Sequence, residues 1–200
     1  MSNGLIVLLG LFAAVAVWVV AVFNRLVRSR NRMRNAFAQI DVQLKRRHDL
    51  IPGLVNTARG YLQHERQTLE GVTLARQRAS DARSAAANPG GRASAELLEA
   101  LDRAEAGLNA ALGKFALVVE AYPELKADRT IMQLSEELTS TENRIGFSRQ
   151  AYNDAVNDYN DAIGVFPASL VATACGFTPA GQLRSTTSAA ERSPVAVSLT

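Results

Sequence analysis

The residues best suited to chemistry stand together in the stretch LKRRHDLIPGL, residues 44–54. The charged cluster at its centre consists of Lys45, Arg46, Arg47, His48 and Asp49. A hydrolase or a phosphate-handling enzyme could use such a cluster, but catalysis also needs a concave site with a positioned acid, base or metal. No evident nucleophile stands here, and the chain has no HExxH, CxxC, GxxxxGK or GxSxG motif. We therefore keep an enzyme as the alternative function and predict no catalytic residue.

A metal site would require His48, Asp49, His64 and Glu65 to converge. The two histidines are 16 positions apart, which places them about 160° apart around a continuous helix. The single cysteine, Cys175, stands far from both histidines and has no cysteine partner in the chain. These spacings predict neither a metal site nor a cofactor, and the lack of a cysteine pair argues against a disulfide-stapled secreted module.

A second group of polar residues comes from a seven-residue repeat, YNDAVND followed by YNDAIGV, at residues 152–165. On a helix this spacing places Tyr152 and Tyr159 on one face, with Asn153 and Asn160 stacked beside them. The four residues could form a recognition stripe for a partner helix. The favoured interpretation is a seam that buries the rings and leaves the hydroxyls in water, because rings at helical spacing are usually core. Partner binding is predicted at these four residues and at Arg46, Arg47, His48 and Asp49.

Apolar residues recur at helical spacing over three stretches, roughly 26–86, 95–121 and 127–166, and Asp128 is expected to cap the third. Pro52 interrupts the first stretch. Either the helix is kinked there and nearly continuous, or it breaks at residues 47–49 so that Asp49 caps a new helix that holds Pro52 in its first turn. The kinked helix is favoured, because apolar spacing persists across the proline.

Three apolar stripes joined by short loops must cover one another. We therefore predict an all-α fold, an elongated antiparallel three- to four-helix bundle over residues 25–177, followed by a disordered tail at 178–200. Charge is uneven along it. Residues 25–49 hold eight cations and two acids, a net +6, whereas residues 96–161 hold six cations and thirteen acids, a net −7. Opposite charges on neighbouring helices can set their pairing.

The first 24 residues carry no charged side chain, and Leu5 to Phe23 is nearly all apolar. Nineteen helical residues span about 28 Å, which matches the hydrocarbon core of a bilayer. A cleaved signal peptide is the alternative, but the run lacks a basic segment before it, and its one Ala-x-Ala match lies in the middle. Residues 1–24 are therefore predicted to be an uncleaved transmembrane anchor.

Five arginines follow the anchor, at positions 25, 28, 30, 32 and 34, with no acid among them. The positive-inside rule then predicts a single-pass protein of the cell (inner) membrane, with its N-terminus outside and the bulk of the chain in the cytoplasm. The same arginines could form a nucleic-acid patch. Topology and anionic lipid head groups explain them without one, so no nucleic-acid partner is predicted.

Four motifs in fixed order follow the anchor: IDVQLKRRHDLIPGLVNTARGYLQHE (40–65), YPELKA (122–127), STENRIGFSRQAYNDAVNDYN (140–160) and FPASLVA (166–172). In these motifs the chain resembles the LemA family of bacterial membrane proteins, over residues 5 to about 177. The resemblance implies a transmembrane helix followed by an elongated helical bundle, and it brings no established catalytic activity. The chain departs from the family pattern at Gly53, where a polar residue is expected, and at Cys175, where an apolar one is usual.

These observations predict a membrane-anchored helical protein that acts as a protein-protein interaction or scaffold module at the cell membrane. The expected partners are the membrane itself and unidentified envelope-associated proteins. Self-association into a homo-oligomer through the helical seams is a further expectation.

Overall fold

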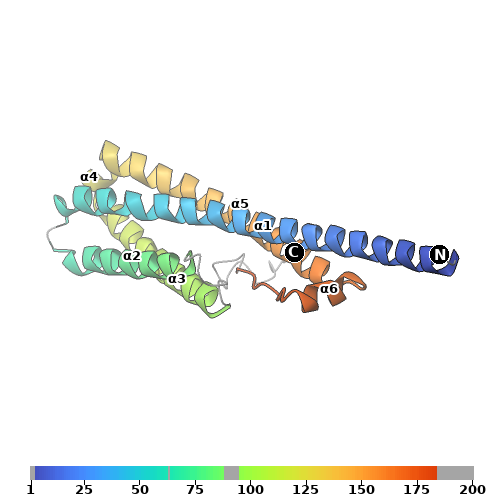
Figure 1. Cartoon of the computed structure of the whole chain (residues 1–200). Helices are drawn as coiled ribbons and strands as arrows, with labels where there is room; N and C mark the ends of the chain where they lie inside the picture. Colours follow the sequence, from blue (N-terminus) through green and yellow to red (C-terminus); the bar gives the residue numbers. More distant parts are fainter. Residues whose placement is uncertain (1–2, 63, 88–94, 184–200) are drawn as a thin grey trace, which may run out of the picture.

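The computed structural model describes residues 3–62, 64–87 and 95–183, and these residues form helices without a strand (Figure 1). The helices are α1 (Asn3–Arg59), α2 (Arg66–Ala86), α3 (Ala95–Ala121), α4 (Pro123–Lys126), α5 (Arg129–Gly164) and α6 (Ala168–Ala174). The predicted all-α fold is confirmed. Figure 1 shows a rod in which α1 and α5 run antiparallel, as do α2 and α3.

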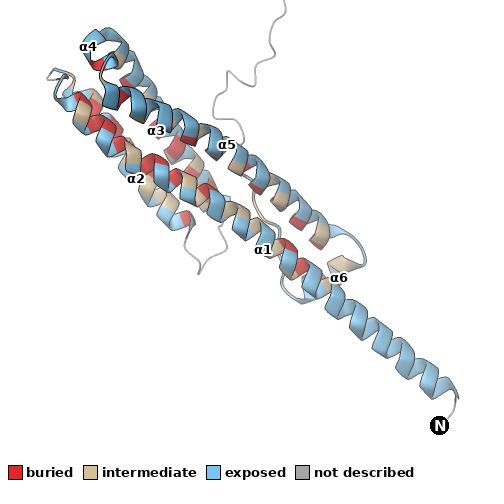
Figure 2. Ribbon diagram, turned by 90° about the horizontal axis from the view of Figure 1, so that it is seen from above, coloured by how far each residue is buried: buried red, intermediate tan, exposed pale blue. Residues whose placement is uncertain are grey.

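The longest element is α1, with 57 residues and therefore about 86 Å of length. Its N-terminal part extends beyond the bundle and is exposed, as the pale blue end in Figure 2 shows. This part is apolar enough to cross a membrane, by length and composition. An apolar helix of this kind suggests a membrane location.

Pro52 lies inside α1 and does not end it. The alternative in which Asp49 caps a new helix is wrong, because Asp49 sits in mid-helix and its carboxylate accepts a hydrogen bond from Lys45 Nζ at 2.6 Å. Pro52 is exposed, whereas Ile51, Leu54 and Val55 around it are buried. Packing on both sides of the proline therefore holds the helix together, and the favoured continuity across residue 52 is confirmed.

The predicted single helical stretch 26–86 is wrong after Arg59, where α1 ends and the chain turns at Gly60 to Leu62; α2 begins at Arg66. The amides of Tyr61 and Leu62 both bond to the Ala58 carbonyl at 3.0 Å, and the Leu62 side chain is buried. Tyr61 also donates to Asp128 Oδ2 at 3.0 Å, and this hydrogen bond raises the pKa of the Tyr61 hydroxyl. Apolar spacing continues on both sides of the turn, so Gly60 was its one sequence signal.

The core consists of three clusters along the rod. One lies at the end far from the N-terminus, one in the middle and one beside the start of the bundle. Each includes residues of α1 and α5, such as Ile51 with Ile131, Leu44 with Ile145, and Leu26 with Ile163. α1 packs most extensively on α5 and α2 on α3, so the bundle consists of two antiparallel pairs laid against each other.

The third predicted helix is α5, and Asp128 caps it as expected. Asp128 Oδ1 accepts hydrogen bonds from the amides of Thr130 at 2.8 Å and Ile131 at 3.1 Å. The bond from the Ile131 amide is the main cause that lowers the pKa of Asp128. A side-chain acceptor at this position satisfies amides that have no partner within the helix.

After α6 the chain reverses at Gly176, whose φ of 70° suits glycine. Residues 177–183, which we call the C-terminal strap, then run without helical structure back along α5. The predicted disordered tail is therefore wrong for residues 178–183, because hydrogen bonds from α5 hold them in place. Residues 184–200 of that tail lie outside the described part of the chain.

Candidate functional site

The charged cluster of residues 45–49 is divided between the interior and the surface of the rod. Arg47 and His48 are 5% and 2% exposed. Lys45 and Asp49 pair with each other at the surface, and exposed Arg46 lies 3.5 Å from Glu137 of α5. Successive residues of a helix point about 100° apart, so an unbroken α1 keeps these five side chains from converging on one point.

The buried half of the cluster meets a carboxylate of α3. Glu105 is 1% exposed, and its two oxygens lie 2.8 Å from His48 Nε2 and 3.1 Å from Arg47 Nη1. Arg47 also reaches Glu142 of α5 at 3.1 Å and bonds to the Asn109 side chain of α3. These contacts, which we call the Arg47–His48–Glu105 cluster, tie α1 to α3 and α5.

The geometry of this cluster favours a structural role over a catalytic or metal-binding one. Both oxygens of Glu105 are engaged by side chains of the protein, and burial excludes bulk water from the histidine. His48 Nδ1 has no hydrogen-bond partner within the described part of the chain. His64 is exposed in the turn after α1, away from buried His48, and no group of three or more metal-binding side chains occurs among the described residues.

Sequence reasoning missed Glu105, although the pattern contained a signal for it. Core residues of α3 fall at Leu98, Leu101, Leu108 and Phe115, and Glu105 occupies the position of this row between Leu101 and Leu108. An acid at a core position needs a buried partner. Arg149 likewise occupies a core position of α5, between Ile145 and Tyr152, and it pairs with Asp102 of α3 at 3.2 Å.

The second predicted site, on α5, holds the C-terminal strap. Tyr159 and Tyr152 donate their hydroxyl hydrogens to the carbonyls of Thr178 and Gly181, both at 2.9 Å. Asn160 brackets Ala180, donating to its carbonyl at 3.0 Å and accepting from its amide at 2.9 Å. Asn153 brackets Leu183 in the same way, at 2.7 and 2.9 Å. We call these four α5 residues the Tyr–Asn ladder.

The register of the ladder follows from the heptad. Seven residues of helix advance about 10.5 Å, and three residues of extended chain advance about 10 Å. Tyr159 and Tyr152 accordingly bind Thr178 and Gly181, while Asn160 and Asn153 bind Ala180 and Leu183. Every bond from the ladder to these strap residues goes to a backbone group. The ladder therefore recognises an extended main chain rather than particular side chains.

The two tyrosines combine features of both interpretations, the buried seam and the recognition stripe. Their rings are buried, and that of Tyr152 packs edge-on against Phe37 at 5.7 Å, as a seam would require. Their hydroxyls bond to the strap instead of water, and burial raises the pKa of Tyr152 to about 12. Partner binding by the ladder stays a prediction, because a partner there would have to replace the chain's own strap.

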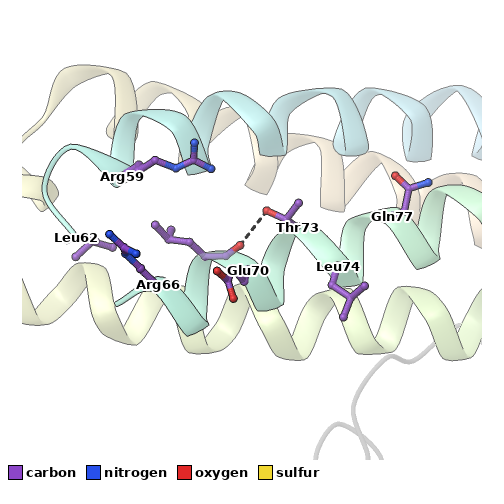
Figure 3. Close-up of a pocket in the computed structure, with 8 residues that line it drawn as sticks. Arg59, Leu62, Arg66, Glu70, Thr73, Leu74 and Gln77 are labelled. Carbon is purple, nitrogen blue, oxygen red and sulfur yellow. Dashed lines mark hydrogen bonds between the residues drawn. The ribbon is translucent and has the colours of Figure 1, made fainter. Parts of the chain in front are cut away.

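A hollow of about 710 Å³ lies at the far end of the rod, between the end of α1 and one side of α2 (Figure 3). Arg59 lines it from α1 and Arg66 and Glu70 line it from α2, where Thr73 uses its hydroxyl to bond to the Leu69 carbonyl of its own helix at 2.9 Å. Leu62, Leu69, Leu74 and Gln77 complete the lining. This lining combines buried leucines with polar side chains of α1 and α2, and it contains no pair of groups arranged for acid–base chemistry.

Comparison with known proteins gives one family and several relatives. The LemA family model matches residues 36–199. The Metamycoplasma hominis protein named "Protein LemA" is 28% identical over 149 residues, which cover 74% of this chain and 63% of that protein. "Magnetosome protein MamQ 2" of Paramagnetospirillum magneticum and "Magnetosome protein MamQ" of Magnetospirillum gryphiswaldense are 35% and 33% identical over 79 residues, 40% of this chain and 29% of each relative. The chain thus spans less than two thirds of the length of these relatives.

Proposed function

The chain belongs to the LemA family, and we propose that it is a membrane-anchored helical scaffold rather than an enzyme. One observation carries the proposal: α1 runs without a break from the exposed apolar segment into the bundle core as far as Arg59. A single helix that both crosses the bilayer and forms part of the core holds the rod in a set direction relative to the membrane. A flexible linker would leave that direction free.

The buried charges support the same proposal. The Arg47–His48–Glu105 cluster is the closest approach to a catalytic constellation among the described residues, and its groups bind one another in the interior. Its position between α1, α3 and α5 suits a contact that sets which helices pair. The alternative, a hydrolase or phosphate-handling enzyme, would need these groups to face a cavity.

We place the protein in the cell inner membrane as a single-pass protein, with its N-terminus outside and the bundle in the cytoplasm. Arg25, Arg28, Arg32 and Arg34 are exposed on α1 directly after the apolar run, where they suit the cytoplasmic leaflet. The test is cysteine labelling in a Cys175→Ser background, with Leu117→Cys on α3 as the exposed reporter. Labelling by an impermeant maleimide is expected only after the cells are opened, and labelling of intact cells would reverse the orientation.

The scaffold role is tested by photo-crosslinking within intact membranes. A photoreactive amino acid replaces one exposed residue on each long helix, at Asp49, Leu74, Leu117 or Phe147. A scaffold is expected to give a defined adduct, with another envelope protein or with a second copy, from at least one position and only after irradiation. If no position yields either kind of adduct, the scaffold role is refuted.

The enzyme alternative has its own test. Asp49→Ala removes an exposed carboxylate and is expected to leave the bundle folded, while His48→Gln removes the imidazole and keeps a polar side chain of similar length in the core. If a cellular phenotype of the gene deletion is rescued by both variants at normal protein levels, the cluster performs no catalysis. Loss of rescue by folded, normally abundant variants would favour the enzyme instead.

A further inference from the structure

The turn between α5 and α6 carries an exposed apolar patch beside the start of the bundle. Its members are Val165, Phe166 and Leu170, which are 62%, 75% and 63% exposed. The opposite side of α6 is buried through Val171 and Ala172. α6 thus has an inner face packed on the protein and an outer face that continues the apolar surface of the turn.

This patch lies at the level where the apolar segment of α1 ends. Val22 and Leu26 of α1 pack in one cluster with Ile163 and Ala172. The rings of Phe23 and Phe177 meet edge-on at 5.9 Å, and the Arg30 guanidinium lies 5.1 Å from the centre of the Phe177 ring. In Figures 1 and 2, α6 lies beside the place where the exposed N-terminal part of α1 leaves the bundle.

The surrounding sequence has the composition of a membrane interface. No Asp, Glu, Lys or Arg occurs from residue 162 to residue 183, a run of 22 residues. Between residues 25 and 161, uncharged runs do not exceed nine residues. The exposed cations nearest in α1 are Arg25 and Arg28, directly after Phe23. Apolar and aromatic side chains beside arginines suit the boundary between acyl chains and anionic head groups.

We propose that Val165, Phe166 and Leu170 form a membrane-interface wedge, which inserts into the head-group and acyl-chain boundary of the bilayer that α1 spans. The inference rests on the proposed membrane anchor, because the span sets the depth of the wedge. If Phe23 marks the end of the span, the packing of α5 and α6 against Val22 and Leu26 brings the wedge to the bilayer surface. The bundle would then contact the membrane at two places, which restricts its tilt.

The chain offers a matched control for this surface. Phe147 is also 75% exposed, and it lies on α5, 19 positions before Phe166. Phe147 precedes the end of α5 at Gly164 by 17 positions, which is about 26 Å along the helix, so Phe147 should stay in water whatever the wedge does. Val15, in the apolar part of α1 and 51% exposed, reports separately on the anchor.

The experiment uses the full chain in phosphatidylcholine–phosphatidylglycerol vesicles, in a Cys175→Ser background. Three variants, Phe166→Cys, Phe147→Cys and Val15→Cys, each carry an environment-sensitive fluorophore. The vesicles contain lipids with a nitroxide quencher either near the head or near the end of the acyl chain. We expect several-fold stronger quenching at residue 166 by the shallow nitroxide than at residue 147, and quenching at residue 15 by the deep one.

Each other outcome has a defined meaning. Equal water exposure at residues 166 and 147, with residue 15 still quenched by the deep nitroxide, would overturn the wedge and leave the anchor in place. No quenching at residue 15 would overturn the anchor and, with it, the proposed function. A label at residue 166 that is shielded from both lipid and water would show that a second copy covers the patch, which also overturns the wedge.

Discussion

The bonds between the Tyr–Asn ladder and the strap can be tested one residue at a time. The perturbation is Asn153→Ala, which removes the two hydrogen bonds between its amide and the Leu183 backbone, at 2.7 and 2.9 Å. Each such bond contributes about 1 kcal/mol net. The free energy of local opening of the strap should therefore fall by about 2 kcal/mol. Since 1.36 kcal/mol corresponds to a tenfold change in an equilibrium constant, the population of the open strap should rise about 30-fold.

The assay is hydrogen exchange of the Leu183 amide, whose N–H is donated to Asn153 Oδ1 in the folded state. Exchange through local opening follows the open population, so this amide should exchange about 30-fold faster in Asn153→Ala. Asn160→Ala should have the same effect at Ala180, which it brackets in the same way. The two variants therefore report on two separate places along the strap.

Matched controls separate this local effect from general destabilisation. Asn153→Asp keeps an acceptor for the Leu183 amide and loses the donor to the Leu183 carbonyl. The exchange rate of the Leu183 amide in this variant should therefore fall between those of the wild type and of Asn153→Ala. Asp154→Ala removes an exposed neighbour on α5 and should change little. An unchanged exchange rate of the Leu183 amide in Asn153→Ala would refute the role of the ladder in holding the strap. Uniformly faster exchange along α5 would instead show that the heptad stabilises the bundle as a whole.

Three further predictions concern the buried charges, the buried tyrosine and the helix cap. Glu105→Ala removes the buried carboxylate partner of His48 and Arg47 and leaves Arg47 with Glu142 and Asn109. The free energy of unfolding should fall by about 3–5 kcal/mol in chemical denaturation. Replacing Glu105, Arg47 and His48 together with apolar residues should recover much of this loss, and a mild effect of the single change would contradict the cluster. Burial raises the pKa of the Tyr152 hydroxyl from its ordinary value of 10.0 to about 12, so its contribution to stability should be complete below pH 10 and lost as the pH rises to about 12. Alkaline unfolding of Tyr152→Phe should lack this component, and an unchanged profile would count against it. Asp128→Ala should lower the melting temperature and speed amide exchange in the first turn of α5, whereas Asp128→Asn should not, since asparagine also caps helices.

Local sequence determined the features that depend on neighbouring residues. The stretch 95–121 was predicted with the bounds that α3 has, because helical spacing runs from one end of it to the other. Asp128 was recognisable as a cap, since a cap acts on amides two and three residues ahead. The turn that follows Arg59 was not predictable in this way, because apolar spacing matches a helix on both sides and only packing of α2 on α3 favours a reversal.

Tertiary structure decided what the polar residues bind. The sequence placed His48 beside Arg47, but only the approach of α3 brings Glu105 into contact with both. Glu105 lies 57 positions after His48 and 58 after Arg47 in the chain. The heptad placed Asn153 and Asn160 in one row, yet their partners are backbone groups 20 to 30 residues away in a segment without a pattern of its own. The ladder partners Thr178, Ala180, Gly181 and Leu183 offer it only the N–H and C=O groups that every non-proline residue carries. Nothing in their sequence therefore distinguishes them until the chain reverses after α6 and lays them along α5.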